Sequence, residues 1–247
     1  MKHNYQIIIE YLGVSYVGWQ VQKKGRSIQG EIQKAITKIF KKKIKIIGAG
    51  RTDAGVNAWG QSANFFLEQK INDKFKFLAA LNFFLKKNNI SIVDLKRRKK
   101  NFNSRFDAKK RNYEYIIING STKLSIFKDR AWLIKKKLNI KNMKEAIKLL
   151  VGSHDFSTFR SSSCSAKSPL RTIQSAKINI HGKKIIINFV SKSFLQQQVR
   201  SMVGCLKYVG ENKWDIKKFK NVFKSKKRKF CAPPAPPEGL YLKKVYY

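Results

Sequence analysis

The amino-acid sequence predicts an α+β fold made of two ferredoxin-like units, each with the element order β-α-β-β-α-β. Segments whose apolar residues alternate, as in strands, are interspersed with segments whose apolar residues recur at helical spacing. The same order of segments occurs in both halves of the 247-residue chain, on either side of a basic stretch near residues 99–111. We therefore expect domains at residues 1–105 and 106–247, with sheets that join edge to edge.

The first half begins with a strand over residues 5–11, in which Tyr5, Ile7 and Ile9 alternate on one face. Ser27 is the expected N-cap of an amphipathic helix that runs to about residue 40. The remaining elements expected in this half are strands at 44–48 and 61–67, a helix at 72–85 and a strand at 90–98.

The second half begins with a strand at 113–118, and a helix is expected around Met143, Ala146 and Ile147, which recur at helical spacing. His181 and Gly182 separate two alternating runs, and this pattern predicts a hairpin. The other expected elements are hairpin strands at 172–180 and 184–190, a helix at 194–206, a short helix near 214–224 and a last strand at 240–245.

The charge balance is strongly basic, with 54 Lys and Arg against 14 Asp and Glu and a formal net charge of +40. A nucleic acid is the natural partner of such a charge, through phosphate neutralisation and counterion release. The chain is also rich in Lys, Ile and Asn together, a bias that places lysines on any solvated face. The 11 arginines are therefore more informative, above all those in patterned segments: Arg51, Arg105, Arg111, Arg171 and Arg200.

The sequence indicates neither a membrane protein nor a metalloprotein. Nowhere do about 18 apolar residues run together, so we expect no signal peptide, no membrane span and a cytoplasmic location. The three cysteines are far apart and form no CxxC motif, so we expect reduced thiols. The three histidines form no spaced cluster with them, and we expect no metal and no cofactor.

The stretch Gly48–Ala58, with the sequence GAGRTDAGVNA, is the strongest candidate for a functional loop. Glycines and alanines surround Arg51 and Asp53, so backbone can approach a ligand closely beside two opposite charges. The alternative is an ordinary turn, since Asp and Gly are common turn formers. The loop fits neither a dinucleotide fingerprint, which needs Gly where Asp53 stands, nor a phosphate-binding loop, because no GK[ST] follows.

Several motifs together resemble those of the TruA family of tRNA pseudouridine synthases. They are YVGWQ at 16–20, SIQGEIQKAI at 27–36, GRTDAGVNAWGQSANF at 50–65, SRFDAKKRNYEY at 104–115, VGSHDF at 151–156, CSAKSPLRTI at 164–173, FLQQQVRSMVG at 194–204 and APPEGLYLKKV at 235–245. The resemblance implies the pseudouridine synthase fold and an isomerase that converts uridine to pseudouridine in the anticodon stem-loop of tRNA, at positions 38, 39 and 40.

The resemblance also implies roles for individual residues. Asp53 is the expected catalytic aspartate, Tyr113 a tyrosine that stacks on the base, and Arg200 an arginine that pairs with the aspartate. Arg200 falls on an expected helix of the second half, so this pairing predicts an active-site cleft between the units; the alternative is an arginine that caps a solvated helix face. Arg51 is expected to enter the stem and help hold the base out. A homodimer that shares one tRNA is also implied.

One carboxylate suffices for this reaction. Glycoside hydrolysis uses two carboxylates, one of which activates water. Here the uracil leaves as a resonance-stabilised anion and rejoins the same sugar through C5, and water has to be kept out. Attack of Asp53 at C1′ and attack at C6 both fit the sequence. The Tyr113 hydroxyl is a candidate for moving the C5 proton, whereas Tyr115 is expected in the core.

The sequence departs from the family pattern at three places. Many relatives have His at the position of Asn57, a His-Ala pair at Asn103-Ser104, and a segment richer in His, aromatic or Met residues at Gln196 to Gln198. These departures concern substrate contacts. They keep open an alternative function, a non-catalytic RNA-binding or RNA-chaperone protein on the same fold.

Overall fold

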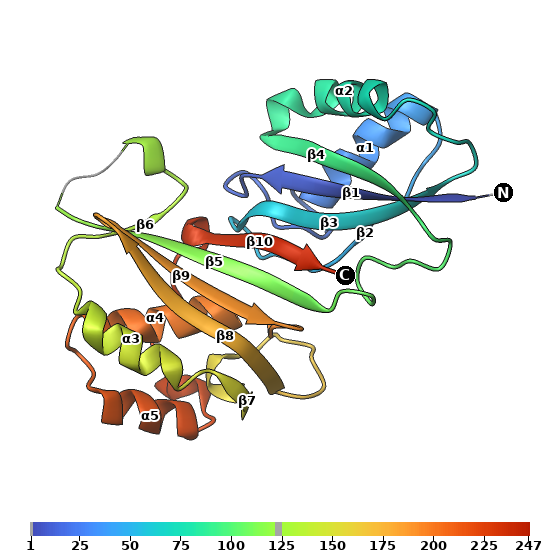
Figure 1. Ribbon diagram of the computed structural model, residues 1–247. Helices are drawn as coiled ribbons and strands as arrows, with labels where there is room; N and C mark the ends of the chain where they lie inside the picture. Colours follow the sequence, from blue (N-terminus) through green and yellow to red (C-terminus); the bar gives the residue numbers. More distant parts are fainter. Residues whose placement is uncertain (1, 122–124) are drawn as a thin grey trace. The chain divides into compact units, whose positions relative to one another are not determined.

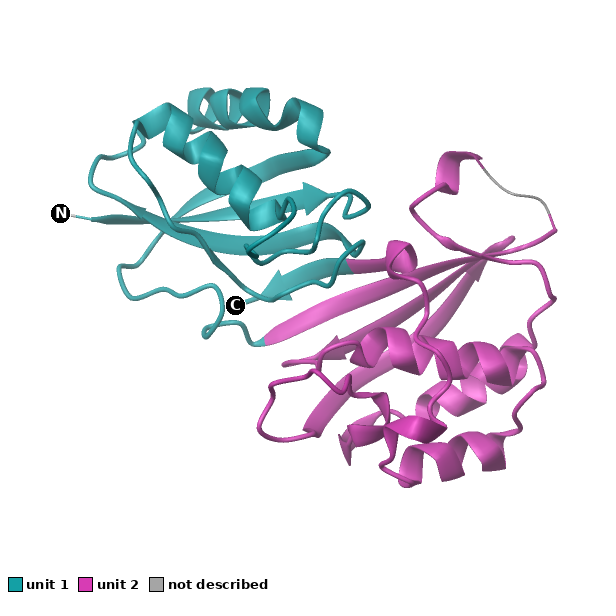
Figure 2. Cartoon of the chain, turned by 180° about the vertical axis from the view of Figure 1, so that it is seen from behind, with its two compact units in different colours: residues 1–109, 242–247 teal, residues 110–241 magenta. Residues whose placement is uncertain are grey.

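The structure, a computed structural model, describes residues 2–121 and 125–247 and falls into two compact units (Figures 1 and 2). Unit 1 comprises Met1–Lys109 and Leu242–Tyr247, and unit 2 comprises Lys110–Tyr241. The first boundary lies four residues after the 105/106 division expected from the sequence. The last six residues return to unit 1, where the Lys243 carbonyl lies so close to Gly60 that a Cβ there would be 2.6 Å from it.

Unit 1 has the expected β-α-β-β-α-β order. Its elements are β1 (His3–Tyr11), α1 (Ile28–Phe40), β2 (Ile47–Gly48), β3 (Asn57–Leu67), α2 (Lys74–Leu85), the 3₁₀ helix η1 (Lys86–Asn88) and β4 (Ile90–Arg98). The strand order is β4-β1-β3, with β2 paired to β3. The central strand β1 is antiparallel to both neighbours, and Ile7 is opposite Ala63 on one side and Leu95 on the other.

Both helices of unit 1 lie on the same face of its sheet (Figure 1). The Ser27 hydroxyl accepts a hydrogen bond from the Gly30 amide at 3.2 Å, which confirms the expected N-cap of α1. The apolar positions of α1 face inward, as the helical spacing predicts; those buried are Ile28, Ile32, Ala35 and Ile36. In α2 the buried residues are Phe77, Leu81 and Leu85. Phe75, which the spacing predicts on the same inner face as Leu81 and Leu85, is instead 81% exposed, because α2 carries apolar residues on more than one face and the spacing alone does not single out the buried one.

Unit 2 contains the expected elements and some that were not expected. Its strands and helices are β5 (Lys110–Asn119), η2 (Ser125–Phe127), β6 (Trp132–Ile134), α3 (Ile140–Lys148), β7 (Gly152–Asp155), η3 (Ser157–Phe159), β8 (Leu170–His181), β9 (Lys184–Ser191), α4 (Gln198–Gly210), α5 (Ile216–Lys224), η4 (Arg228–Phe230), η5 (Pro237–Gly239) and β10 (Leu240–Tyr246), whose last residues belong to unit 1. The strand order is β5-β9-β8-β7, and α3, α4 and α5 lie on one face (Figures 1 and 2).

The longer strands of both units pair antiparallel. In unit 1 β1 is antiparallel to β3 and β4, and in unit 2 β9 is antiparallel to β5 and β8. Gly182 has a φ of +58° at the tip of the β8–β9 hairpin, a conformation that favours glycine and confirms the turn expected at His181-Gly182. These findings confirm the α+β class.

Short strands and element ends are where the expectations were wrong. Strands β6 and β7 have three and four residues, too few for an alternation to stand out. Strand β2 covers only two residues instead of 44–48, and β3 begins four residues before the expected start at 61. Asn57 and Gln61 are fully buried in β3. Because these core positions are polar, the apolar alternation that predicts a strand is interrupted there.

Helix α4 begins four residues later than expected. Gln197, with a φ of +60°, is in a left-handed conformation that a helix cannot contain, and the Leu195 amide donates to the Gln198 side-chain oxygen at 2.7 Å. Phe194 and Leu195 therefore belong to the turn before the helix. Their apolar character reflects packing and not helical periodicity.

Helix α4 contacts the segment that follows η4 at very short range. Gly204 lies in the middle of the helix, and a Cβ at this position would be 2.1 Å from the Pro233 carbonyl oxygen. The Ala235 amide donates to the Arg200 carbonyl at 2.9 Å. Only glycine permits this approach, and the contact fixes residues 233–235 against the helix.

Replacing Gly204 with Ala is expected to lower the free energy of unfolding by about 1–3 kcal/mol, because either the helix or the 233–235 backbone has to shift. Denaturant unfolding measures this loss. The matched control is Gly120→Ala, whose new Cβ would meet only the flexible Lys183 side chain, at 3.3 Å. Equal stability of the two variants would contradict the close contact.

Candidate active site

Asp53 lies at the start of a tight turn in the loop between β2 and β3. The Val56 amide donates to the Asp53 carbonyl at 3.2 Å, and Gly55 has a φ of +76°. This is the third position of a type II turn, which requires a positive φ and therefore favours glycine. Asp53 is half-buried and Arg51 is exposed. The turn fixes the backbone that carries the Asp53 carboxylate.

Two hydrogen bonds attach the start of this loop to β3. The Ala49 amide donates to the Ser62 carbonyl at 2.7 Å, and the side-chain amide of Gln61 donates to the Gly50 carbonyl at 2.9 Å. Gln61 is fully buried, so its side chain is held in one place. The loop therefore has little freedom to change its position relative to the sheet of unit 1.

A second loop, formed by residues 12–27, packs behind the first. The Trp19 amide donates to the Thr52 carbonyl at 3.1 Å, and the hydroxyls of Tyr11 and Thr52 are 2.8 Å apart. Gly18 has a φ of +110°, and a Cβ there would be 2.6 Å from the Thr52 carbonyl oxygen. The residue before Asp53 is thus held by backbone and side chain at once.

Other residues of unit 1 occupy the space beside Gly48 and Gly13, where a side chain would otherwise lie. The Trp19 ring fills the space beside Gly48, where a Cβ would be 2.5 Å from the indole. A Cβ at Gly13 would be 2.2 Å from the Val56 carbonyl oxygen, and the Gly13 amide donates to the Asn57 side chain at 2.7 Å. Gly48 therefore accommodates an indole of the protein itself, and Asn57 has a structural role.

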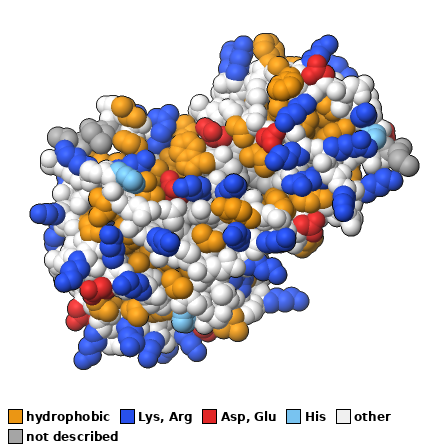
Figure 3. Space-filling view, in the orientation of Figure 1, with side chains coloured by type: hydrophobic (Ala, Val, Ile, Leu, Met, Phe, Trp, Pro, Cys, Tyr) orange, Lys and Arg blue, Asp and Glu red, His pale blue; other side chains and the backbone are white. Residues whose placement is uncertain are grey.

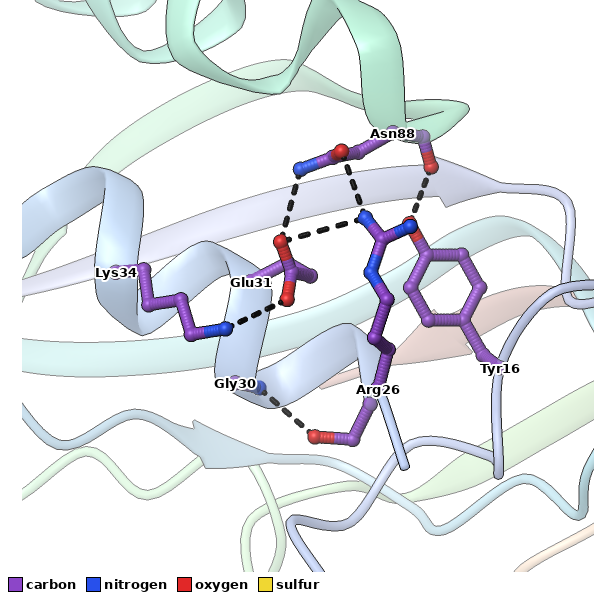
Figure 4. Close-up of polar contacts among 7 residues, drawn as sticks. Tyr16, Arg26, Gly30, Glu31, Lys34 and Asn88 are labelled. Carbon is purple, nitrogen blue, oxygen red and sulfur yellow. Dashed lines mark hydrogen bonds and ion pairs between the residues drawn. The ribbon is translucent and has the colours of Figure 1, made fainter. Parts of the chain in front are cut away.

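A polar cluster around Glu31 anchors the second loop to α1 and η1 (Figure 4). The Glu31 carboxylate lies 3.0 Å from the Lys34 ammonium and 3.5 Å from the Arg26 guanidinium. The Asn88 side chain donates to Glu31 at 3.1 Å and accepts from Arg26 at 2.8 Å, and the Tyr16 hydroxyl donates to the Asn88 carbonyl. Since Tyr16 and Arg26 belong to the second loop, the cluster indirectly supports the Asp53 loop.

The cluster changes the acidity of Glu31. Partial burial alone would raise the pKa of its carboxyl group, but the hydrogen bonds and positive charges of Lys34 and Arg26 outweigh this effect and lower it. Glu31 is therefore charged at neutral pH and stabilises the folded state.

Tyr113 lies on β5 of unit 2, in register with Phe189 of β9. It is 8% exposed, and its ring contacts the edge of Phe194 with centroids 5.2 Å apart at an angle of 85°. The contact orients the tyrosine ring. Phe194 belongs to the turn before α4, so the late start of that helix places an aromatic residue beside Tyr113.

Arg200 lies in the first turn of α4, and its side chain is held in place. Its Nε donates to the Ala235 carbonyl at 2.7 Å, while the Ala235 amide donates to the Arg200 carbonyl. The side chain is half-buried and bound to another segment, so it does not simply cap a solvated helix face.

Tyr115 has the core position that the sequence predicts. It is fully buried, its hydroxyl donates to the Pro236 carbonyl at 2.8 Å, and Gly239 packs against its ring. Burial, together with the negative charge of Glu238, raises the pKa of Tyr115 well above its ordinary value, against an opposite effect of Arg200. Tyr115 is therefore neutral at any physiological pH.

The structure thus places Asp53 and Arg51 on one loop of unit 1, and Tyr113 and Arg200 on β5 and α4 of unit 2. The sequence did not identify the residues that hold the Asp53 loop, Thr52, Gln61 and Trp19. The sequence signals were a glutamine in an alternating strand for Gln61 and a tryptophan in a glycine-punctuated loop for Trp19, and Thr52 had none beyond its place next to Asp53. Gln198, one of the family departures, is fully buried and binds the Leu195 amide.

Nothing in the described part of the chain resembles a metal centre. No group of three His, Cys, Asp or Glu side chains among residues 2–121 and 125–247 is arranged to hold an ion. His154 contacts the Val151 carbonyl and the ring of Phe223, which agrees with a structural role. No helix in these same ranges is long and apolar enough to cross a membrane.

The family model described as tRNA pseudouridine synthase matches residues 7–107 and 146–247. The chain belongs to this family. The match includes Arg51, Asp53 and Arg200, whereas Tyr113 lies in the interval between its two parts. The family membership confirms the resemblance seen in the sequence and the expected fold.

Individual relatives match nearly from end to end. A protein of Pelagibacter ubique named tRNA pseudouridine synthase A is 54% identical over 243 residues, which cover 98% of this chain and 99% of the relative. Proteins of the same name from Afipia carboxidovorans and Ehrlichia chaffeensis are 41% and 43% identical, with the same coverage of both chains.

Replacing Glu31 with Gln is expected to destabilise unit 1 by about 0.5–1 kcal/mol at neutral pH, because the half-exposed cluster loses its negative charge. The folded pKa of Glu31 is lowered, so its contribution is complete above the ordinary Glu pKa of about 4.3 and is lost as the pH falls through the folded value. Denaturant unfolding at a series of pH values measures the difference.

The control is Glu68→Gln, since Glu68 pairs with Lys42 on the surface and both side chains are more than 60% exposed. Lys42 also lowers the pKa of Glu68, but solvent screens this exposed pair, so the variant should differ from the wild type far less than Glu31→Gln does. A difference between Glu31→Gln and the wild type that persists at a pH below the folded pKa of Glu31 would contradict the charge-based account.

Proposed function

We propose that this protein is a cofactor-free isomerase that converts uridine to pseudouridine in the anticodon stem-loop of tRNA, at positions 38, 39 and 40. The observation that carries the proposal is the match to the tRNA pseudouridine synthase family over both units. Relatives named as tRNA pseudouridine synthases support an enzymatic function. They give no support to the alternative, a non-catalytic RNA-binding or RNA-chaperone protein.

Asp53 is proposed as the catalytic carboxylate. The reaction breaks the bond between N1 and C1′, turns the uracil, joins C5 to C1′ and releases the C5 proton. A charged group placed before the reaction begins stabilises developing charge without the cost of reorganisation. The turn at Gly55, the hydrogen bond to Thr52 and the attachment of the loop's first residues to β3 support such a fixed position in unit 1.

Three further residues are proposed to bind the substrate. Tyr113 stacks on the uracil and moves the C5 proton with its hydroxyl, a role that its fixed ring beside Phe194 supports. Arg51, exposed two residues before Asp53, contacts the stem and helps hold the flipped base. Arg200 supplies the positive charge that keeps Asp53 ionised, and its bond to the Ala235 carbonyl supports a fixed orientation. The pairing of Arg200 with Asp53 stays a prediction.

The charge of the chain suits a tRNA partner. Lys and Arg side chains are spread over the whole visible face of the molecule and do not gather in one stripe (Figure 3). Such a surface attracts a polyanion from a distance, while the arginines of the two units give local contacts. We further propose a homodimer that shares one tRNA, and a cytoplasmic location.

Replacing Asp53 with Asn is expected to lower turnover by about 10³-fold or more, because the amide carries no charge to offset the developing positive centre. The assay measures hydrogen released from C5 of labelled uridine in tRNA, and a filter-binding measurement follows tRNA affinity, which should change little. Full activity in this variant would overturn the proposal.

The matched control is Asp73→Asn. Asp73 caps α2 by accepting from the Lys76 amide at 2.9 Å, and Asn is an equally good cap. The same change of charge on the same unit should therefore leave turnover and stability at the wild-type level.

Replacing Tyr113 with Phe keeps the ring and removes the hydroxyl, so turnover should fall by about 10²-fold while tRNA affinity is retained. Tyr115→Phe is the control, since it removes a hydroxyl that only binds the Pro236 carbonyl; it should lower stability by about 1 kcal/mol and leave turnover unchanged. Wild-type turnover in Tyr113→Phe would exclude proton transfer by this hydroxyl.

A further inference from the structure

Two of the three cysteines of the chain lie side by side in unit 2. Cys205 is in α4 and fully buried, whereas Cys231 follows η4 and is half-buried. Their sulfur atoms are 3.5 Å apart. A disulfide bond is about 2.05 Å long, so an approach of roughly 1.5 Å would suffice to join them. The third cysteine, Cys164, interacts with the backbone of Ala166 and Gln196.

The surroundings give the two thiols different acidities. The hydrogen bond with Cys205 lowers the pKa of Cys231; burial opposes this change, and the nearby charge of Arg228 adds to it. The same contact and its own burial raise the pKa of Cys205. The Arg228 guanidinium lies 3.4 Å from the Cys231 sulfur and also binds the Ser201 hydroxyl at 2.7 Å. Cys231 is thus the more nucleophilic sulfur, beside a protonated partner.

A bond between these sulfurs would join two parts of unit 2 that already touch. Cys205 is the residue after Gly204, whose missing side chain admits the Pro233 carbonyl. Cys231 begins the segment that reaches Ala235, which is hydrogen-bonded to Arg200 through both backbone and side chain. The cross-link would therefore fix the segment that positions Arg200.

We propose that Cys205 and Cys231 form an oxidation site for hydrogen peroxide, in which Cys231 is the attacking thiolate and Cys205 the resolving thiol. The Cys231 thiolate attacks one peroxide oxygen, the O–O bond breaks, and hydroxide leaves, which gives a sulfenic acid. The Cys205 sulfur then attacks the Cys231 sulfur, and its proton leaves with the sulfenic oxygen as water. The two sulfurs lose two electrons in total, and peroxide gains them.

The test uses the purified full-length protein, fully reduced, freed of reductant and treated with hydrogen peroxide. Peptide mapping by mass spectrometry without reduction is expected to find the Cys205 and Cys231 peptides linked, with the loss of two hydrogens, and reduction with dithiothreitol should reverse the link. Cys164, whose pKa is also lowered through its backbone contacts and Arg160, reports whether the dose of oxidant was sufficient.

Two variants separate the roles of the thiols. In Cys205→Ser, Cys231 should remain a sulfenic acid that dimedone traps; in Cys231→Ser, Cys205 should stay unreactive. Cys164→Ser should form the link as the wild type does. Oxidation of Cys164 without any Cys205–Cys231 link would overturn the proposal, as would direct oxidation of Cys205 in Cys231→Ser. Neither result depends on whether the protein modifies tRNA.

Discussion

The hydrogen bond from the Trp19 amide to the Thr52 carbonyl joins two irregular loops, and the position of Asp53 depends on it. Loops without regular structure keep a fixed shape only where their backbone groups find partners. Gly13, Gly18 and Gly48 bring the two loops close enough for such bonds, since a Cβ at any of them would collide with the opposite loop. The cluster around Glu31 and Asn88 then prevents the rear loop from moving away from α1.

In unit 2 a close backbone contact at a glycine also positions a charged residue, Arg200. Gly204 lets the backbone of Pro233 lie directly on α4, and the resulting contact brings the Ala235 carbonyl to the Arg200 side chain. In both units a close contact at a glycine thus helps to hold the backbone beside a charged residue. The same contact in unit 2 places the Cys205 and Cys231 sulfurs together, so the proposed oxidation site is a direct consequence of how Arg200 is positioned.

Most of the fold was predictable because long elements have clear periods. The strands at β1 and β4 and the helices α1 and α2 were found within a few residues, and the Ser27 cap was correct. The start of α4 was not predictable, because the left-handed Gln197 interrupts a run of residues that all look helical. Asp53 and Arg200 were predicted as site residues because they lie in motifs that resemble those of the family. The contacts of Thr52 with Trp19 and of Cys205 with Cys231 join distant residues, and no local pattern reveals such pairs.

The central claim is that a rigid loop in this chain presents one carboxylate to uridines of the anticodon arm. It is tested most directly by incubating the purified protein with an unmodified tRNA that has uridines both inside and outside this arm, and by mapping pseudouridine at single-nucleotide resolution. The account predicts pseudouridine at positions 38, 39 and 40 and at no other uridine. A tRNA that remains unmodified, or one modified only outside the anticodon arm, would contradict it.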